Sequence, residues 1–326
     1  MFRRCILLLL LLQSWPALTG TIAQVAPRSL PEVVRIEAQP QKGFIYPYYL
    51  YVPPELRQEG AKKARQTILV APNNTGNEDD DLSVHDSAAR QWANSLRGII
   101  ARRNLNVVLL VPVFPRPKTD WKIYTHALDR DSLLTDKKEY RRFDLQLVHM
   151  IDDARERLRA PGLRLDKRVL MFGYSASGMF TNRFAFLHPQ RIKAAAFGSP
   201  GGWAIAPVSS YQGQSLRYPI GVADFKAVSG KTFDLKALKK VPLFLFMGDE
   251  DTNDSVVFRD SYEMEDEKLI FDLFGKTLLK RWPITKALYE EQLPNAVLKL
   301  YPKVGHVWNK EMTDDVIAFF LSHLHD

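Results

Sequence analysis

The chain is poor in cysteine, and its apolar runs are short. Cys5 is the one cysteine among the 326 residues, so a disulfide within the chain is excluded and stability must come from a buried core. The N-terminal apolar run, from Cys5 to Leu12, is far shorter than the roughly 20 residues that a membrane-spanning helix needs. We therefore expect no stable membrane insertion.

The excess of positive charge is also small. Lysine and arginine outnumber aspartate and glutamate by 45 to 37, which gives a formal net charge of +8. Basic residues cluster only briefly, as at Lys62-Lys63 and Lys239-Lys240, without the interleaved aromatic residues of a platform that stacks nucleic-acid bases. We expect solvated surface at these clusters and no nucleic-acid partner. A positive charge favours anionic surfaces in general but says nothing about a reaction.

The first 23 residues have the pattern of a secretory signal peptide. Arg3 and Arg4 precede the apolar run, and small residues lead to Ala23. We expect cleavage after Ala23, which removes Cys5, lowers the net charge to +6 (45 − 2 = 43 basic residues against 37 acidic) and leaves 24–326 as a single domain. The mature protein is then periplasmic or extracellular. A retained membrane anchor is the alternative.

An abrupt strand-to-helix turn is centred on Ser175. The apolar run Val169 to Phe172 predicts a buried parallel strand, which Gly173 ends, and Met179 to Leu187 continues as a helix. A serine between small residues at such a turn is held in a strained backbone conformation with its hydroxyl at the carboxyl end of the sheet. That position suits a nucleophile.

This turn resembles the G-x-S-x-G signature of the α/β-hydrolase family. Gly173, Tyr174 and Ala176 fit the signature around the serine, whereas Ser177 replaces the second glycine and Gly178 follows directly. The resemblance covers nearly all of the mature chain. It implies a mostly parallel central sheet with helices on both faces, and an acid and then a histidine after later strands.

The acid is expected after the strongly apolar strand Val241 to Met247. The family commonly places glycine, two residues and then the catalytic aspartate there, and this spacing selects Asp251. Asp249, Glu250 and Asp254 crowd the same loop and remain candidates, as does the interpretation of a plain polar surface loop.

The histidine is expected in the loop after the last strand, Ala296 to Tyr301. His306 lies there, before a terminal helix at about 310–324, where the resemblance implies the general base. Ser175, Asp251 and His306 thus follow the chain order of the family's catalytic triad.

The resemblance implies that half of an oxyanion hole follows the strand Thr67 to Ala71. That strand runs into a loop of turn residues in which we assign Asn74 the donor role, with Asn73 and Thr75 as neighbours. The resemblance places the other half at the backbone N–H of Ala176. A plain strand-to-helix turn is the alternative interpretation of the loop.

The remaining segments frame these residues. Glu32 to Ala38 and Phe44 to Val52 predict an antiparallel pair, with Pro47 indicating an edge position for the second strand. The aperiodic segment 120–134 forms either a wall of the substrate site or ordinary surface, and the long stretch 199–240 predicts a small cap or substrate-binding insertion. Candidate substrate-binding residues are Tyr174, Trp121, Tyr124 and Trp203. Further helices are expected at 83–103, 143–158, 263–274 and 283–292, and a strand at 107–113.

The pattern as a whole favours an exported serine carboxylesterase that acts through an acyl-enzyme on a small-molecule or polymeric ester. The resemblance requires no metal and no organic cofactor. A compact peptidase of the prolyl-oligopeptidase type and a binding protein that lost the chemistry of the fold are the two alternatives.

Overall fold

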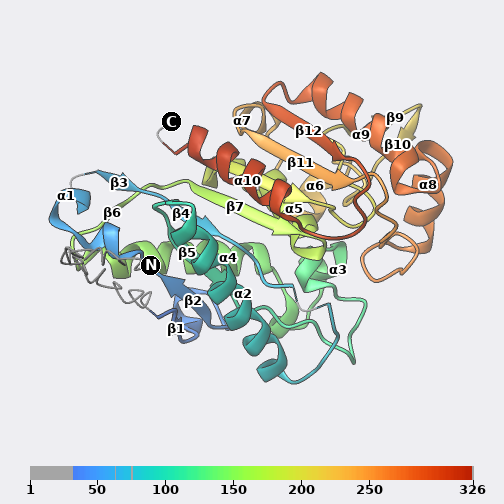
Figure 1. The fold of residues 1–326 in the computed structure, drawn as a ribbon. Coiled ribbons are helices and arrows are strands. Elements are labelled where there is room, and N and C mark those ends of the chain that lie inside the picture. Colours follow the sequence, from blue (N-terminus) through green and yellow to red (C-terminus); the bar gives the residue numbers. More distant parts are fainter. Residues whose placement is uncertain (1–31, 63, 75, 325–326) are drawn as a thin grey trace, which may run out of the picture. The chain divides into compact units, whose positions relative to one another are not determined.

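The computed structural model describes residues 32–62, 64–74 and 76–324 (Figure 1). The predicted signal peptide and Cys5 lie outside the described residues. Among the described residues, no helix is long and apolar enough to cross a membrane. No group of three or more histidine, cysteine, aspartate or glutamate side chains within this part of the chain could hold a metal ion.

The centre of the described unit is an eight-stranded sheet in the order β1-β2-β5-β4-β7-β8-β11-β12. The strands are β1 Val34–Ile36, β2 Tyr48–Tyr51, β4 Ile68–Val70, β5 Val108–Pro112, β7 Val169–Tyr174, β8 Ile192–Gly198, β11 Leu243–Gly248 and β12 Ala296–Tyr301. The six strands from β5 to β12 in this order are parallel, and β1 and β2 add an antiparallel pair at one side. This is the mostly parallel sheet that the sequence predicts.

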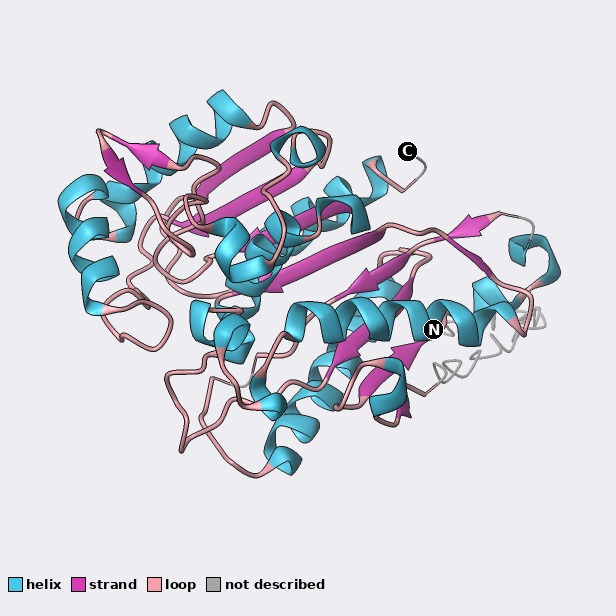
Figure 2. Cartoon of the chain, turned by 180° about the vertical axis from the view of Figure 1, so that it is seen from behind, coloured by secondary structure: helices cyan, strands magenta, loops and turns pink. Residues whose placement is uncertain are grey.

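Helices cover both faces of this sheet because its strands are apolar on both sides. Along β7, Val169 and Met171 pack into one apolar core, whereas Leu170 and Phe172 pack into a second core on the opposite face, as the alternation of side chains in a strand requires. Figure 1 shows α2 (Leu82–Arg102) and α10 (Lys310–Ser322) on one face, and Figure 2 shows the other face. There α4 (Phe143–Arg159), α5 (Ala176–Leu187) and α9 (Leu278–Gln292) supply the core side chains.

The shorter elements lie mainly in the connections. They are α1 Glu59–Lys62, α3 Arg130–Leu134, α6 Phe225–Ser229, α7 Leu235–Leu238, α8 Met264–Phe274, the paired short strands β3 Arg65–Gln66 with β6 Arg164–Leu165 and β9 Ser210–Tyr211 with β10 Gln214–Ser215, and the 3-10 turns at 40–42, 54–57, 125–127, 138–140 and 189–191. The stretch 199–240 therefore holds only β9, β10, α6 and α7. Its Trp203 and Ile220 pack in a third apolar cluster with Ile270 and Phe274 of α8.

Two local predictions are wrong, both at a proline. β2 is an internal strand between β1 and β5, and the edge strand is β1. Pro47 is tolerated because it lies just before β2, where its carbonyl accepts a hydrogen bond from the Val113 N–H at 2.9 Å. Helix α9 begins at Leu278 rather than at Pro283, and Pro283 lies inside it.

A buried carboxylate anchors the start of α4. Asp144 accepts two hydrogen bonds of 2.8 Å from the Arg142 guanidinium and one of 2.8 Å from His188 Nε2. Burial by itself raises the pKa of Asp144, but the hydrogen bonds from Arg142 and His188 outweigh it and lower the pKa to about 2. Because the folded pKa lies below the unfolded value near 4, the ionised carboxylate stabilises the fold above about pH 4.

Asp144→Asn should therefore lower the free energy of unfolding by about 2 kcal/mol at neutral pH. The difference from the wild type should shrink as the pH falls from about 4 toward about 2, because the wild-type carboxylate then becomes protonated as well. Urea unfolding at several pH values measures this. Asp136→Asn is the matched control, since Asp136 is exposed and forms no ion pair with any described residue. A destabilisation by Asp144→Asn that does not change with pH would contradict the account.

Candidate active site

Ser175 occupies a strained turn between β7 and α5. Its φ of 59° and ψ of −127° lie in a region that side-chain-bearing residues rarely adopt. The turn is this sharp because α5 crosses very close to the sheet. A Cβ at Gly173 would lie 2.0 Å from the Ser177 carbonyl oxygen, and a Cβ at Gly178 would lie 2.5 Å from the Gly198 carbonyl oxygen.

The departure of this turn from the family signature has a structural explanation. The Ser177 hydroxyl donates to the Tyr174 carbonyl oxygen at 2.9 Å and accepts from the Tyr174 N–H at 3.0 Å. Ser177 therefore ties the first turn of α5 back to the end of β7. The residue at which the helix comes closest to β8 is therefore Gly178, one position later than the second glycine of the signature.

Gly178→Ala should destabilise the fold by about 1–3 kcal/mol, because the added methyl group collides with backbone atoms that cannot rotate away. Gly60→Ala is the matched control, since a Cβ at Gly60 meets no atom within 4 Å. Urea unfolding of both variants measures the difference. Equal stability of the two variants would show that α5 can shift away from the sheet without cost.

His306 is held by Asp251. The imidazole Nδ1 lies 2.9 Å from Asp251 Oδ2 and 3.0 Å from Oδ1. Burial raises the pKa of Asp251, but hydrogen bonds from His306 and from the Asn253 N–H, at 2.9 Å, outweigh it and leave the pKa below its ordinary value. The buried carboxylate is therefore ionised and fixes Nδ1 as the protonated nitrogen, so Nε2 carries the lone pair. The Asn253 side-chain amide lies 3.1 Å from Nε2.

A close contact between two loops makes this pairing possible. The loop after β11 carries Asp251, and the loop after β12 carries His306. A Cβ at Gly248 would lie 1.9 Å from the Val304 carbonyl oxygen, so only glycine lets the loops approach this closely.

The other acids after β11 point to different partners. Asp254 Oδ1 accepts hydrogen bonds from Arg281 Nη1 at 2.9 Å and from the Val256 N–H at 3.1 Å. Asp249 accepts from the Lys303 N–H at 2.7 Å, and Glu250 is exposed. Of the four candidate acids, the structure brings Asp251 to His306.

One cavity of about 380 Å³ joins these loops to Ser175. Its lining includes Asn74, Arg116, Tyr124, Ser175, Ala176, Asn253, Asp260 and His306. The serine, the histidine and both oxyanion-hole candidates therefore share one space at the carboxyl ends of the parallel strands. This is the edge at which open α/β sheets bind their ligands.

Asn74 is hydrogen-bonded to the turn at Ser175. The Asn74 side-chain amide donates to the Tyr174 carbonyl oxygen at 3.3 Å, and its Oδ1 accepts from the Gly76 N–H at 3.3 Å. Asn73 is buried and exchanges two hydrogen bonds with the backbone of Phe114, at 2.9 and 3.0 Å, which joins the loops after β4 and β5. Thr75 lies outside the described residues.

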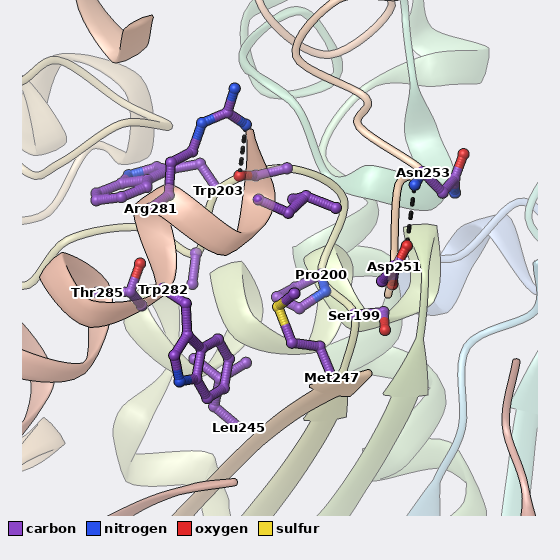
Figure 3. Close-up of a pocket in the computed structure, with 13 residues that line it drawn as sticks. Ser199, Pro200, Trp203, Leu245, Met247, Asp251, Asn253, Arg281, Trp282 and Thr285 are labelled. Atoms are coloured by element: carbon purple, nitrogen blue, oxygen red, sulfur yellow. Dashed lines mark hydrogen bonds between the residues drawn. The ribbon is translucent and has the colours of Figure 1, made fainter. Parts of the chain in front are cut away.

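One of the four candidate substrate-binding aromatics, Tyr124, lines the cavity. Tyr174 does not line it, but the centre of its ring lies 5.2 Å from that of His306, which does. Trp121 is exposed beside Lys122 and does not line this cavity. Trp203 lines a second cavity of about 30 Å³ behind Asp251, shown in Figure 3, where it stacks on Phe274 with ring centroids 4.0 Å apart.

Charged residues that sequence reasoning missed also line the Ser175 cavity. The Arg116 guanidinium lies 4.1 Å from the Tyr124 ring centre and 3.2 Å from Asp260, and Glu78 pairs with it at 3.3 Å. Burial raises the pKa of Asp260 more than Arg116 lowers it. Arg116 follows β5 between two prolines, and its place at the carboxyl end of a parallel strand was the one available signal.

The chain is similar to known proteins in its structure and not detectably in its sequence. No protein-family model matches the chain, and no curated protein matches its sequence. The structure of poly(aspartic acid) hydrolase-1 from Sphingomonas sp. KT-1 is similar, with a TM-score of 0.56 and 17% identity over 91% of this chain and 99% of that chain. Poly(3-hydroxybutyrate) depolymerase LpqC from Bordetella parapertussis is also similar, with a TM-score of 0.53 and 16% identity over 89% and 90% of the chains. At these identities the likeness establishes a shared fold.

Proposed function

Because the chain has the α/β-hydrolase fold, we propose that it is a serine hydrolase that cleaves carboxylic esters through an acyl-enzyme intermediate. The observation that carries the proposal is the contact of Asp251 with His306, which lines the same cavity as the strained Ser175. The fold shared with a poly(aspartic acid) hydrolase and a depolymerase supports a hydrolytic reaction.

In the proposed reaction, Ser175 Oγ attacks the ester carbonyl while its proton passes to the lone pair on His306 Nε2. Asp251 holds the imidazole in the required tautomer and stabilises its charge once it is protonated. The proton then passes to the departing alcohol. Water, activated in the same way, releases the acyl group and restores Ser175.

The negative charge that develops on the carbonyl oxygen requires hydrogen-bond donors near Ser175. Helix α5 begins at Ala176, and backbone N–H groups at the start of a helix have no intrahelical partner and lie at the positive end of the helix dipole. A backbone N–H from the loop at Asn74 supplies the second donor in this proposal. The Asn253 amide, which lies at Nε2 in the free protein, must move aside when that nitrogen accepts the proton.

Polymeric esters belong in the substrate search beside small ones. The depolymerase that shares the fold is named for a polyester, poly(3-hydroxybutyrate). Arg116 and Asp260 line the cavity, and Glu78, which does not line it, also pairs with Arg116, so carboxylates of the protein already balance the one guanidinium charge at the cavity. Because Arg116 is already paired with carboxylates, we expect the site to accept an uncharged acyl group more readily than one that bears a carboxylate.

Hydrolysis of a 4-nitrophenyl ester series from acetyl to dodecanoyl, beside a peptide 4-nitroanilide and poly(3-hydroxybutyrate), tests the proposal. Turnover of at least one ester well above that of the anilide is expected. Faster cleavage of the anilide would favour a compact peptidase. No cleavage of any activated acyl substrate would favour a binding protein on this fold.

Export is a separate part of the proposal. It rests on Arg3 and Arg4, the short apolar run and the small residues up to Ala23. Mass spectrometry of protein recovered from outside the cytoplasm should show a chain that begins near Gln24. An intact Met1 on that material would contradict cleavage.

A further inference from the structure

A third cavity, lined mostly by basic side chains, lies at the opposite end of the sheet from Ser175. It has a volume of about 350 Å³. Its lining residues are Arg65, Arg155, Arg159, Arg164 and Lys167, together with Leu163 and Leu165. We propose that this cavity, here called the arginine cavity, binds a ligand that carries several closely spaced phosphate groups.

The strands place the arginine cavity away from the catalytic edge. β3 leads directly into β4, and β6 leads into β7, so the β3–β6 pair extends the β4–β7 pair at its amino end (Figure 1). Ser175 follows the other end of β7. The arginine cavity is therefore a site separate from the Ser175 cavity, and the proposal does not depend on the proposed hydrolase activity.

Positive charges are placed opposite one another in this cavity. Arg65 and Arg164 are direct partners in the register of the β3–β6 pair. Like charges on paired positions of neighbouring strands repel each other. Neither arginine has an ion-pair partner among the described residues, so no acid in that part of the chain neutralises them. A bound anion would remove this repulsion.

Among the basic lining residues, only Arg155 has an ion-pair partner in the described part of the chain, and Asp166, between Leu165 and Lys167, pairs instead with Lys193 at 3.2 Å. Asp152 pairs with Arg155 at 3.2 Å, but the same oxygen also accepts from Arg191 at 2.6 Å. Arg155 Nε is buried without a hydrogen-bond partner among the described residues. The position of Arg159 in the last turn of α4 explains its positive charge, because the helix dipole favours a cation there. The helix dipole does not explain the positive charges of Arg65, Arg164 and Lys167, which lie outside α4.

The chemistry of the lining favours phosphate. Guanidinium groups present paired N–H donors that match the oxygens of a phosphate, and Lys167 adds a point charge. The volume is that of a small-molecule site rather than of a single-ion site. Leu163 and Leu165 are buried and line the same cavity, which gives it an apolar part beside the basic groups.

Calorimetric titration with inorganic tripolyphosphate at low salt tests this site. Arg65→Ser/Arg164→Ser should weaken binding about tenfold or more, because two charged hydrogen-bond donors are lost. Lys239→Ser/Lys240→Ser is the matched control, since it removes the same charge from an exposed pair outside the cavity and should weaken binding less than about twofold. Without ligand, the arginine double variant should unfold at the wild-type temperature or above it, which also shows that it folds.

Sedimentation with phosphatidylglycerol vesicles separates a free ligand from a lipid headgroup. Binding of tripolyphosphate alone supports a soluble phosphorylated ligand, and additional vesicle binding that the arginine double variant loses supports a headgroup. Equal weakening in both double variants would reduce the effect to net charge and overturn the proposal. Failure of the wild-type protein to bind tripolyphosphate would also overturn it. Ester hydrolysis should be unchanged in the arginine double variant, so this test and that of the hydrolase fail independently.

Discussion

Ser175→Ala is expected to lower ester turnover by about a million-fold, with little change in the free energy of unfolding. The hydroxyl is the attacking group in the proposed reaction, and no other side chain on the cavity can replace it at the turn. The strained backbone at φ 59° does not depend on the hydroxyl, so alanine should keep the turn. Steady-state hydrolysis with the best ester of the series, together with urea unfolding, measures both quantities.

Ser177→Ala is the control for that experiment. Ser177 lies two residues away on the same turn, but its hydroxyl is bonded to the backbone of Tyr174. Its loss should cost about 1 kcal/mol of stability and only a small part of the turnover. A Ser175→Ala variant that kept a tenth of the activity would remove Ser175 from its role, and Ser177 would be tested next.

Asp251→Asn is expected to lower turnover by about ten-thousand-fold near neutral pH. An amide at this position can still bond Nδ1, but it favours the tautomer whose Nε2 carries a proton and cannot accept one from serine. Its side chain is almost fully buried beside His306, so circular dichroism and urea unfolding must show that the variant folds.

Asp254→Asn is the matched comparison, because the same substitution is made three residues away. Asp254 is paired with the buried Arg281, so its loss should cost stability and leave most of the turnover. A large loss of turnover in Asp254→Asn with a small loss in Asp251→Asn would move the catalytic acid. Ser175 and His306 would keep their assignments.

The parallel sheet could be predicted because buried strands leave a strong mark on the sequence. The runs at Val169 to Phe172 and at Val241 to Met247 are continuous and apolar, and the structure places both in internal strands of the sheet, β7 and β11. Pro47 misled because a proline inside an apolar run looks the same whether it lies within a strand or one residue before it. Only the pairing of β2 with β5 distinguishes the two cases.

The parts of the site that sequence could not reveal depend on which loops meet. The residue Arg116 comes from the loop after β5 and Asp260 from the loop after β11, and no spacing in the sequence says that they pair. The choice among the four candidate acids Asp249, Glu250, Asp251 and Asp254 likewise depends on the approach of Gly248 to the Val304 carbonyl. The place of Trp203 behind Asp251 follows from its stacking on Phe274 of α8, which is a contact between segments far apart in the sequence.

The site of covalent labelling by a fluorophosphonate is the most direct test of the central claim. The reagent requires an activated serine, and peptide mass spectrometry identifies the residue that it modifies. We predict one adduct per chain, on Ser175, formed rapidly in the wild-type protein and at least a hundredfold more slowly in His306→Ala, since general-base catalysis contributes about that factor. Labelling of another residue, or labelling of Ser175 at the same rate in both proteins, would contradict the account.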